Sequence, residues 1–92
     1  MTILDDNADS FLSKNEGVLV MVHTAWCGHC KTMKPDFIRV SDELAASNSA
    51  ARLAAIEGDK FRNWLEPFDV SGFPTLLYFE KGKRAGFVHS KN

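Results

Sequence analysis

The chain of 92 residues contains only two cysteines, and they stand three positions apart within the stretch Trp26–Lys31, which reads Trp-Cys-Gly-His-Cys-Lys. At the start of a helix, this Cys-x-x-Cys spacing puts both sulfur atoms on one turn, close enough to form a small disulfide and to open it again. The residue types and their spacing therefore indicate a redox-active pair.

Three features of this stretch favour a thiolate at Cys27. A helix N-terminus presents unpaired backbone N–H groups and a partial positive charge, which stabilise a negative sulfur. A protonated His29 adds to this effect, and Lys31 follows at once. Because a stabilised thiolate favours the reduced form, the pair becomes a better oxidant of other thiols. We expect Cys27 to exchange with substrate sulfur and Cys30 to act as the resolving thiol.

Other uses of two nearby cysteines fit this chain less well. A zinc site needs four ligands; His23, His29 and His89 could complete the number, but no second Cys-x-x-Cys and no histidine pair at zinc-finger spacing is present. Lys31 stands where a c-type haem needs histidine, and an iron–sulfur cluster needs more cysteines. A permanent structural disulfide stays open as an alternative, although so short a loop removes little unfolded-state entropy. We expect no metal and no organic cofactor.

Composition indicates one small globular domain over residues 1–92. The apolar fraction of 45% and the charged fraction of 25% are ordinary. The net charge of −1 gives no attraction to nucleic acid or to an acidic membrane surface. No apolar run is long enough to span a bilayer, and we expect no signal peptide in this stretch.

Hydrophobic patterning predicts an α/β sheet that leads into the cysteine pair. Residues 18–22 are apolar at every position, which is typical of a strand covered on both faces. The cysteines follow directly, so they should lie at the C-terminal end of a central strand, where sites of open α/β sheets are usually found. Four further strands are predicted, at residues 2–4, 52–56, 76–79 and 84–88.

Three helices are predicted between these strands. The first begins at the Asp5-Asp6-Asn7 cap and ends at Gly17. The second runs from Gly28 to about Asn48, with Pro35 kinking it. The third covers residues 60–66 and ends at Pro67. The apolar stripe of the second helix comprises Met33, Phe37, Ile38, Val40, Leu44 and Ala45.

Two turns carry recognisable signals. Pro74 at the mouth of a strand is a candidate for a cis peptide bond, because an X-Pro bond adopts this isomer at little cost. Gly82 in the turn Glu80–Lys83 is expected to need a positive φ.

The order of elements and two motifs resemble the thioredoxin superfamily over almost the whole chain. The motifs are the Cys-Gly-His-Cys stretch and Gly72-Phe73-Pro74-Thr75. The first resembles the catalytic domains of protein disulfide isomerases. The resemblance implies a thioredoxin-like α/β fold, with a central mixed sheet flanked by helices and a cis Pro74.

The resemblance also implies roles for single residues. Cys27 would be the exposed nucleophile and Cys30 the buried resolving thiol, while His29 biases the pair toward oxidation. Trp26, Gly28 and Lys31 would support the pair. The segment formed by Phe73, Pro74 and Thr75 would bind substrate, with the Phe73 backbone adding to an extended substrate chain as a strand does.

The chain departs from the family pattern in two respects. The buried acid that the family usually carries six residues before the first cysteine is Met21 here, and its usual lysine partner falls at about Ala55. His23 is a candidate replacement as a nearby proton carrier. The helix that normally ends the fold is missing, so we interpret residues 1–92 as a domain excised or truncated from a longer chain.

The leading hypothesis is an enzyme, a thiol–disulfide oxidoreductase of the protein disulfide isomerase type. Its partners would be unfolded or misoxidised client proteins and glutathione, with no nucleic acid and no membrane, and the domain would be monomeric. The resemblance places it in the endoplasmic reticulum lumen as part of a longer secretory chain, with the cytoplasm as the alternative. Two alternatives stay open: a cytosolic thioredoxin-like reductase, and a chaperone or peptide-binding module in which the thiols are secondary.

Overall fold

A computed structural model describes residues 2–47, 50–68, 70 and 72–90, the last seven of them by their backbone alone. Its elements are β1 (Thr2–Leu4), α1 (Ala8–Lys14), β2 (Gly17–His23), α2 (Gly28–Ala46), β3 (Ala51–Glu57), α3 (Arg62–Leu65), a 3₁₀ turn (Glu66–Phe68), β4 (Thr75–Glu80) and β5 (Lys83–Ser90). All five predicted strands are confirmed. None of the helices in this part of the chain has the length and apolar character that crossing a membrane requires.

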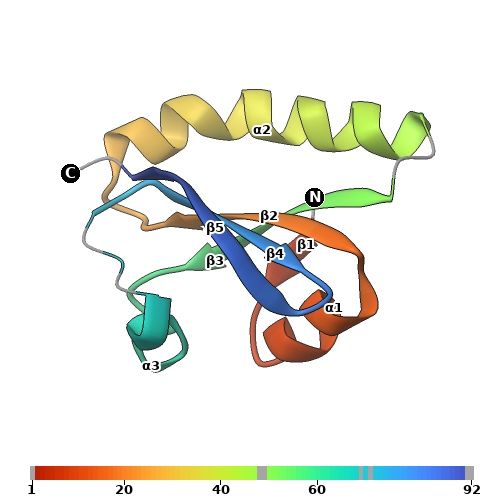
Figure 1. Cartoon of the computed structure of the whole chain (residues 1–92). Helices are drawn as coiled ribbons and strands as arrows, with labels where there is room; N and C mark the ends of the chain where they lie inside the picture. Colours follow the sequence, from red (N-terminus) through yellow and green to blue (C-terminus); the bar gives the residue numbers. More distant parts are fainter. Residues whose placement is uncertain (1, 48–49, 69, 71, 91–92) are drawn as a thin grey trace.

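The strands form one mixed sheet with the order β1-β3-β2-β4-β5 (Figure 1). The central strand β2 runs parallel to β3 and antiparallel to β4, and its Val22 pairs with Ile56 on one side and Thr75 on the other. β1 is parallel to β3, and β5 closes the other edge as a hairpin with β4. The predicted α/β fold with a mixed sheet is confirmed.

Helices cover both faces of the sheet, as the unbroken apolar run of β2 predicted. Val18, Val20 and Val22 belong to the core on the side of α1 and α3, while Met21 belongs to the core that includes Phe37 of α2. Figure 1 shows α2 lying along one face and α1 and α3 against the other. Alternate residues of one strand thus fill two cores, because successive side chains point to opposite faces.

Helix α2 buries a narrower stripe than the sequence predicted. Phe37 is buried and Met33 and Leu44 pack against the same core, whereas Ile38 and Val40 are 38% and 39% exposed. The prediction was wrong for Ile38, Val40 and also Ala45. At about 100° per residue, Ile38 and Ala45 turn away from the face that contains Phe37, and Val40 lies at the edge of that face. Pro35 lies inside α2. The helix ends at Ala46, and Asn48, where we placed its end, lies outside the described residues.

Two predicted helix ends were wrong. α1 ends at Lys14, and Gly17 is the first residue of β2 rather than a helix stop. A Cβ built on Gly17 would lie 2.6 Å from Tyr78 Oη, so close packing against β4 explains the glycine. The third helix is shorter than the predicted residues 60–66: α3 ends at Leu65, and Pro67 lies in the 3₁₀ turn that follows it.

The turn between β4 and β5 confirms the prediction for Gly82. Lys81 has a φ of 51° and Gly82 a φ of 86°, and Glu80 pairs with Lys83 across them. Two residues with positive φ define the type I′ turn, whose twist matches that of the flanking strands.

Candidate active site

The two cysteines form a disulfide across the first turn of α2. Their Cα atoms are 5.3 Å apart, and Cys27 is the N-cap residue of the helix. The Cys30 backbone N–H donates to Cys27 Sγ over 3.2 Å, and the Lys31 N–H reaches the Cys27 carbonyl over 3.3 Å. The pair therefore lies where the last strand residue of β2, His23, gives way through a short loop to a long helix, as the sequence predicted.

The N-cap position explains how this site can hold a negative sulfur. The N–H groups of the first helical turn have no intrahelical acceptor, and the helix dipole adds a partial positive charge at this end. Cys27 Sγ already accepts one of these N–H groups as a disulfide sulfur. A Cys27 thiolate would accept the same hydrogen bond with a full negative charge, and charge-assisted hydrogen bonds are stronger.

Both cysteines are buried in the disulfide form. Cys27 is 5% exposed and Cys30 is 3% exposed. The expectation of an exposed Cys27 was therefore wrong for this state, because the N-cap conformation folds its sulfur back over the first turn, where it meets the Cys30 N–H. What distinguishes the two thiols is their place in the chain: Cys27 lies at the loop and Cys30 inside the helix.

The residues around the cysteines lie on the solvent side. Gly28, His29 and Lys31 are all exposed. A Cβ built on Gly28 meets nothing within 4 Å, so packing does not require glycine at this position.

The predicted substrate segment lies beside the cysteine pair, although it is more than forty residues away in sequence. The Phe73–Pro74 peptide bond is cis. The Phe73 ring meets the Trp26 ring edge to face, with centroids 5.5 Å apart. Thr75 is fully buried, and its hydroxyl donates to the Gly72 carbonyl. Thr75 thus holds the loop in place. Phe73 is half-buried and contacts Trp26, the residue that precedes Cys27.

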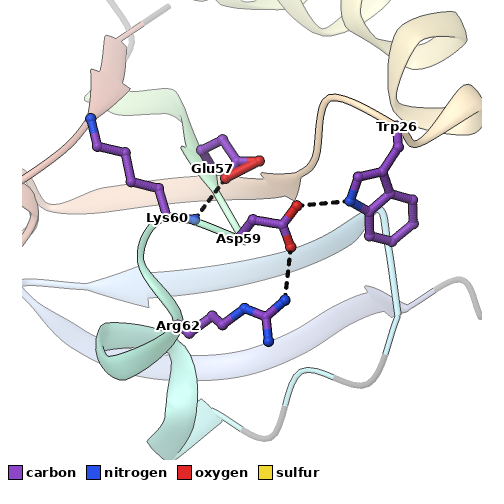
Figure 2. Close-up of polar contacts among 5 residues, drawn as sticks. All are labelled: Trp26, Glu57, Asp59, Lys60 and Arg62. Carbon is purple, nitrogen blue, oxygen red and sulfur yellow. Dashed lines mark hydrogen bonds and ion pairs between the residues drawn. The ribbon is translucent and has the colours of Figure 1, made fainter.

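Asp59 is a site residue that the sequence reading did not single out. Figure 2 shows its carboxylate between two partners: Trp26 Nε1–H donates to Oδ2 over 2.7 Å, and Arg62 Nη2 lies 3.2 Å from Oδ1. The Trp26 side of the pair is thereby tied to the loop after β3. The sequence did contain a signal for Asp59, which follows directly after β3. Because β2 and β3 are parallel, the residues that follow them meet at the same end of the sheet.

Gly58 is a second site residue that the sequence analysis did not indicate. Its N–H donates to the His23 carbonyl over 2.7 Å, which joins the ends of β2 and β3. A Cβ at this position would lie 2.5 Å from Phe73 Cε1. Glycine therefore allows the loop that carries Phe73 to pack closely against the end of β3.

The position of the usual buried acid is apolar in this structure. Met21 is fully buried, and its register partner on β3 is Ala55, also fully buried. His23 lies two residues further along β2 and lines a pocket of about 430 Å³ together with Cys30, Lys34 and Glu57. Burial lowers the pKa of His23, Lys34 lowers it further, and Glu57 opposes the shift. These surroundings therefore favour the neutral ring.

In the described part of the chain, no three histidine, cysteine, aspartate or glutamate side chains gather as they would around a metal ion.

The fold and the site together define a class of protein: an α/β domain with a cysteine pair at a helix N-terminus beside a cis-proline loop. The chain belongs to the thioredoxin family, whose model, described as Thioredoxin, matches residues 1–92. Its sequence is similar to protein disulfide-isomerases over most of its length. Protein disulfide-isomerase A5 of Bos taurus is 40% identical over 81 residues, which cover 87% of this chain and 16% of that protein.

Two further comparisons agree. A probable protein disulfide-isomerase A6 of Medicago sativa is 40% identical over 75 residues, covering 82% of this chain and 20% of the relative. The structure of human ERp44 superposes with a TM-score of 0.89 at 24% identity, over 99% of this chain and 28% of that one. The chain thus spans a fifth or less of the two curated relatives, and the ERp44 likeness establishes the fold.

Proposed function

We propose that this domain is a thiol–disulfide oxidoreductase of the protein disulfide isomerase type, which forms, reduces and reshuffles disulfides in client proteins. The observation that carries the proposal is the disulfide between Cys27 and Cys30 across the N-terminus of α2. Its sulfurs can alternate between a bond to each other and a thiolate that the helix end stabilises. The similarity to protein disulfide-isomerases supports the same function.

In the oxidising direction, a client thiolate attacks Cys27 Sγ. The bond between the two cysteines breaks, and Cys30 leaves with the electron pair and takes up a proton. A second client thiolate then attacks the client sulfur of the mixed disulfide, which releases Cys27 as a thiolate and leaves the client oxidised. In the isomerising direction, the reduced Cys27 thiolate attacks a wrong client disulfide, and the freed client thiolate attacks elsewhere.

The residues around the pair fit supporting roles. His29 and Lys31 are exposed next to Cys27 and add positive charge near a thiolate when protonated. Trp26 and Gly28 complete the exposed rim. In the loop beside the cysteine pair, the Phe73 backbone pairs with an extended client segment. The buried Pro74 and Thr75 hold that backbone in place.

The partners follow from this chemistry. Unfolded or misoxidised proteins are the clients, and glutathione exchanges with the same pair. The domain works as a monomer within a longer chain in the endoplasmic reticulum lumen, an oxidising compartment in which such exchange is productive. The lengths of the relatives, several times that of this chain, support a multidomain parent.

The proposal is tested by trapping. Cys30→Ala removes the resolving thiol, so when the reduced Cys27 thiolate attacks a disulfide of a client protein, the client should stay bound to Cys27 as a mixed disulfide, seen as a dithiothreitol-sensitive adduct by mass spectrometry. The matched control Cys27→Ala should give at least about tenfold less adduct. No adduct with Cys30→Ala, or equal adduct with both variants, contradicts the proposal.

A second measurement separates the isomerase from a thioredoxin-like reductase. Equilibration of the dithiol with glutathione buffers gives its reduction potential. An oxidising value, near the roughly −180 mV typical of protein disulfide isomerase, supports the proposal. A value near the roughly −270 mV of thioredoxin would assign the domain to reduction instead.

A further inference from the structure

The proton of Cys30 poses a problem that the cysteine pair does not solve. Cys30 is 3% exposed, yet it must lose its proton before it can attack the mixed disulfide. The family's acid position holds Met21, which is fully buried and cannot accept a proton. A base for this step must come from another residue that reaches the same space.

The pocket behind the disulfide brings such residues together. Cys30 lines it with His23 and Glu57, and Lys31 and Lys34 of α2 form part of its wall. Its volume of about 430 Å³ is ample for water molecules, each of which occupies about 30 Å³ in the liquid. A proton can therefore cross this space along hydrogen-bonded water.

Two residues that line the pocket each have a buried polar atom without a partner. Within the part of the chain that the structure describes, His23 Nε2 and Thr24 Oγ1 are buried side-chain atoms with no hydrogen-bond partner. Buried polar atoms normally have partners, which are protein groups or ordered water. Glu57 differs, because its Oε2 accepts the Lys60 N–H over 2.8 Å (Figure 2). The two possible bases in this pocket are His23 and Glu57. His23 Nε2 has no hydrogen-bond partner on the protein, whereas Glu57 Oε2 has one.

The charges around His23 keep its ring ready to accept. Burial lowers its pKa, and the positive charge of Lys34 on α2 lowers it further. Glu57, its register partner on β3, acts in the opposite direction and is the weaker influence. Neutral imidazole has a free lone pair on one nitrogen, so it can accept a proton and then release it.

We propose that His23 is the proton acceptor for Cys30 in the resolving step, a proposal that rests on the oxidoreductase function above. Cys30 gives its proton through pocket water to His23 Nε2. The Cys30 thiolate then attacks Cys27 Sγ, the bond between Cys27 and the substrate sulfur breaks, and the substrate leaves with the electron pair as a thiolate. His23 passes its proton on to solvent. Both cysteines are oxidised and the substrate disulfide is reduced; the reverse reaction uses protonated His23 as the donor.

The test separates the two steps with oxidised glutathione as the probe. Reduced Cys30→Ala protein reports only the first attack, by the appearance of the glutathione adduct on Cys27. Reduced wild-type and His23→Gln proteins report the second step, by the decay of that adduct to the internal disulfide after rapid acid quenching. We expect His23→Gln to leave adduct formation unchanged and to slow its decay at pH 7 by about tenfold or more, given the 10²–10⁴-fold typical of a positioned base.

The pH dependence of the adduct decay rate distinguishes a proton acceptor from a residue with a purely structural role, because a structural role of His23 would not shift its midpoint. Adduct decay in the wild type should rise with pH through a midpoint below 6.5, as His23 loses its proton. Lys34→Gln, at an exposed position, removes a charge that lowers the His23 pKa, so the midpoint should move up. Glu57→Gln should move it down. His29 and Lys31 are unchanged in every variant, so a difference between the profiles does not come from these residues.

A rescue variant guards against loss of folding. Met21 lines the same pocket, so Met21→Glu combined with His23→Gln should restore at least part of the decay rate. Wild-type decay in a folded His23→Gln protein, or a midpoint unmoved by Lys34→Gln, would overturn the proposal. Loss of the pH dependence in Glu57→Gln would assign the base to Glu57 and likewise overturn it. Failure of Cys30→Ala to form any adduct would instead refute the oxidoreductase function.

Discussion

Replacing Gly58 with alanine tests the packing that holds the Phe73 loop beside the cysteine pair. The new Cβ would lie 2.5 Å from Phe73 Cε1, 2.9 Å from Phe73 Cζ and 3.3 Å from Val22 Cγ1. Overpacking of this kind costs about 1–3 kcal/mol. Phe73 is half-buried and its ring can swing outward, whereas Val22 is fully buried and cannot. We therefore expect a loss of roughly 1–2 kcal/mol of unfolding free energy.

Urea unfolding of the oxidised protein measures this loss, and thermal unfolding should show a fall in Tm of at least about 4 °C for a domain of this size. Displacement of Phe73 should also shift the NMR signal of the Trp26 indole N–H, because the two rings are in contact. Gly28→Ala is the matched control, since its Cβ meets nothing within 4 Å, and it should not be destabilised. Wild-type stability with an unshifted Trp26 signal in Gly58→Ala would refute the reasoning.

Two further predictions concern the loop after β3 and the β4–β5 turn. Asp59→Ala removes the acceptor of the Trp26 indole N–H and should speed its hydrogen exchange, while the unfolding free energy changes by less than about 1 kcal/mol because the lost ion pair is exposed; unchanged exchange would contradict the assigned hydrogen bond. Gly82→Ala should cost about 1–2 kcal/mol, since Gly82 has a φ of 86°. Lys81→Asn should instead raise the unfolding free energy in the same denaturation assay, because asparagine tolerates the positive φ of this type I′ turn. Equal changes in unfolding free energy for the two variants would argue against the turn assignment.

The strands and the place of the cysteine pair were predictable because their signals are local. The apolar run of β2 cannot face water on either side, so it had to be a central strand. A cysteine pair directly after such a strand then had to lie at its carboxyl end. The turn at Gly82 was readable for the same reason, since two short flanking strands and one glycine suffice to specify it.

The predictions that were wrong depended on contacts between distant segments. Gly17 is a typical helix stop in sequence, but in the fold it is the first residue of β2, with the Tyr78 side chain of β4 packed over it. We predicted too many buried residues on the apolar face of α2, because apolar residues such as Ile38 also occur on exposed faces. The burial of Cys27 depended on how its sulfur folds over the first turn, which residue spacing does not reveal.

The sequence by itself indicated a redox pair, because two cysteines three positions apart at a helix start have few other uses. Only the tertiary structure decided which side chains surround them. Asp59 reaches Trp26, Phe73 packs on Gly58, and His23 shares a pocket with Cys30. These contacts form because β2 and β3 end, and β4 begins, at the same end of the sheet. Residue types and spacing fix what a group can do, whereas the pairing of distant strands fixes which groups it meets.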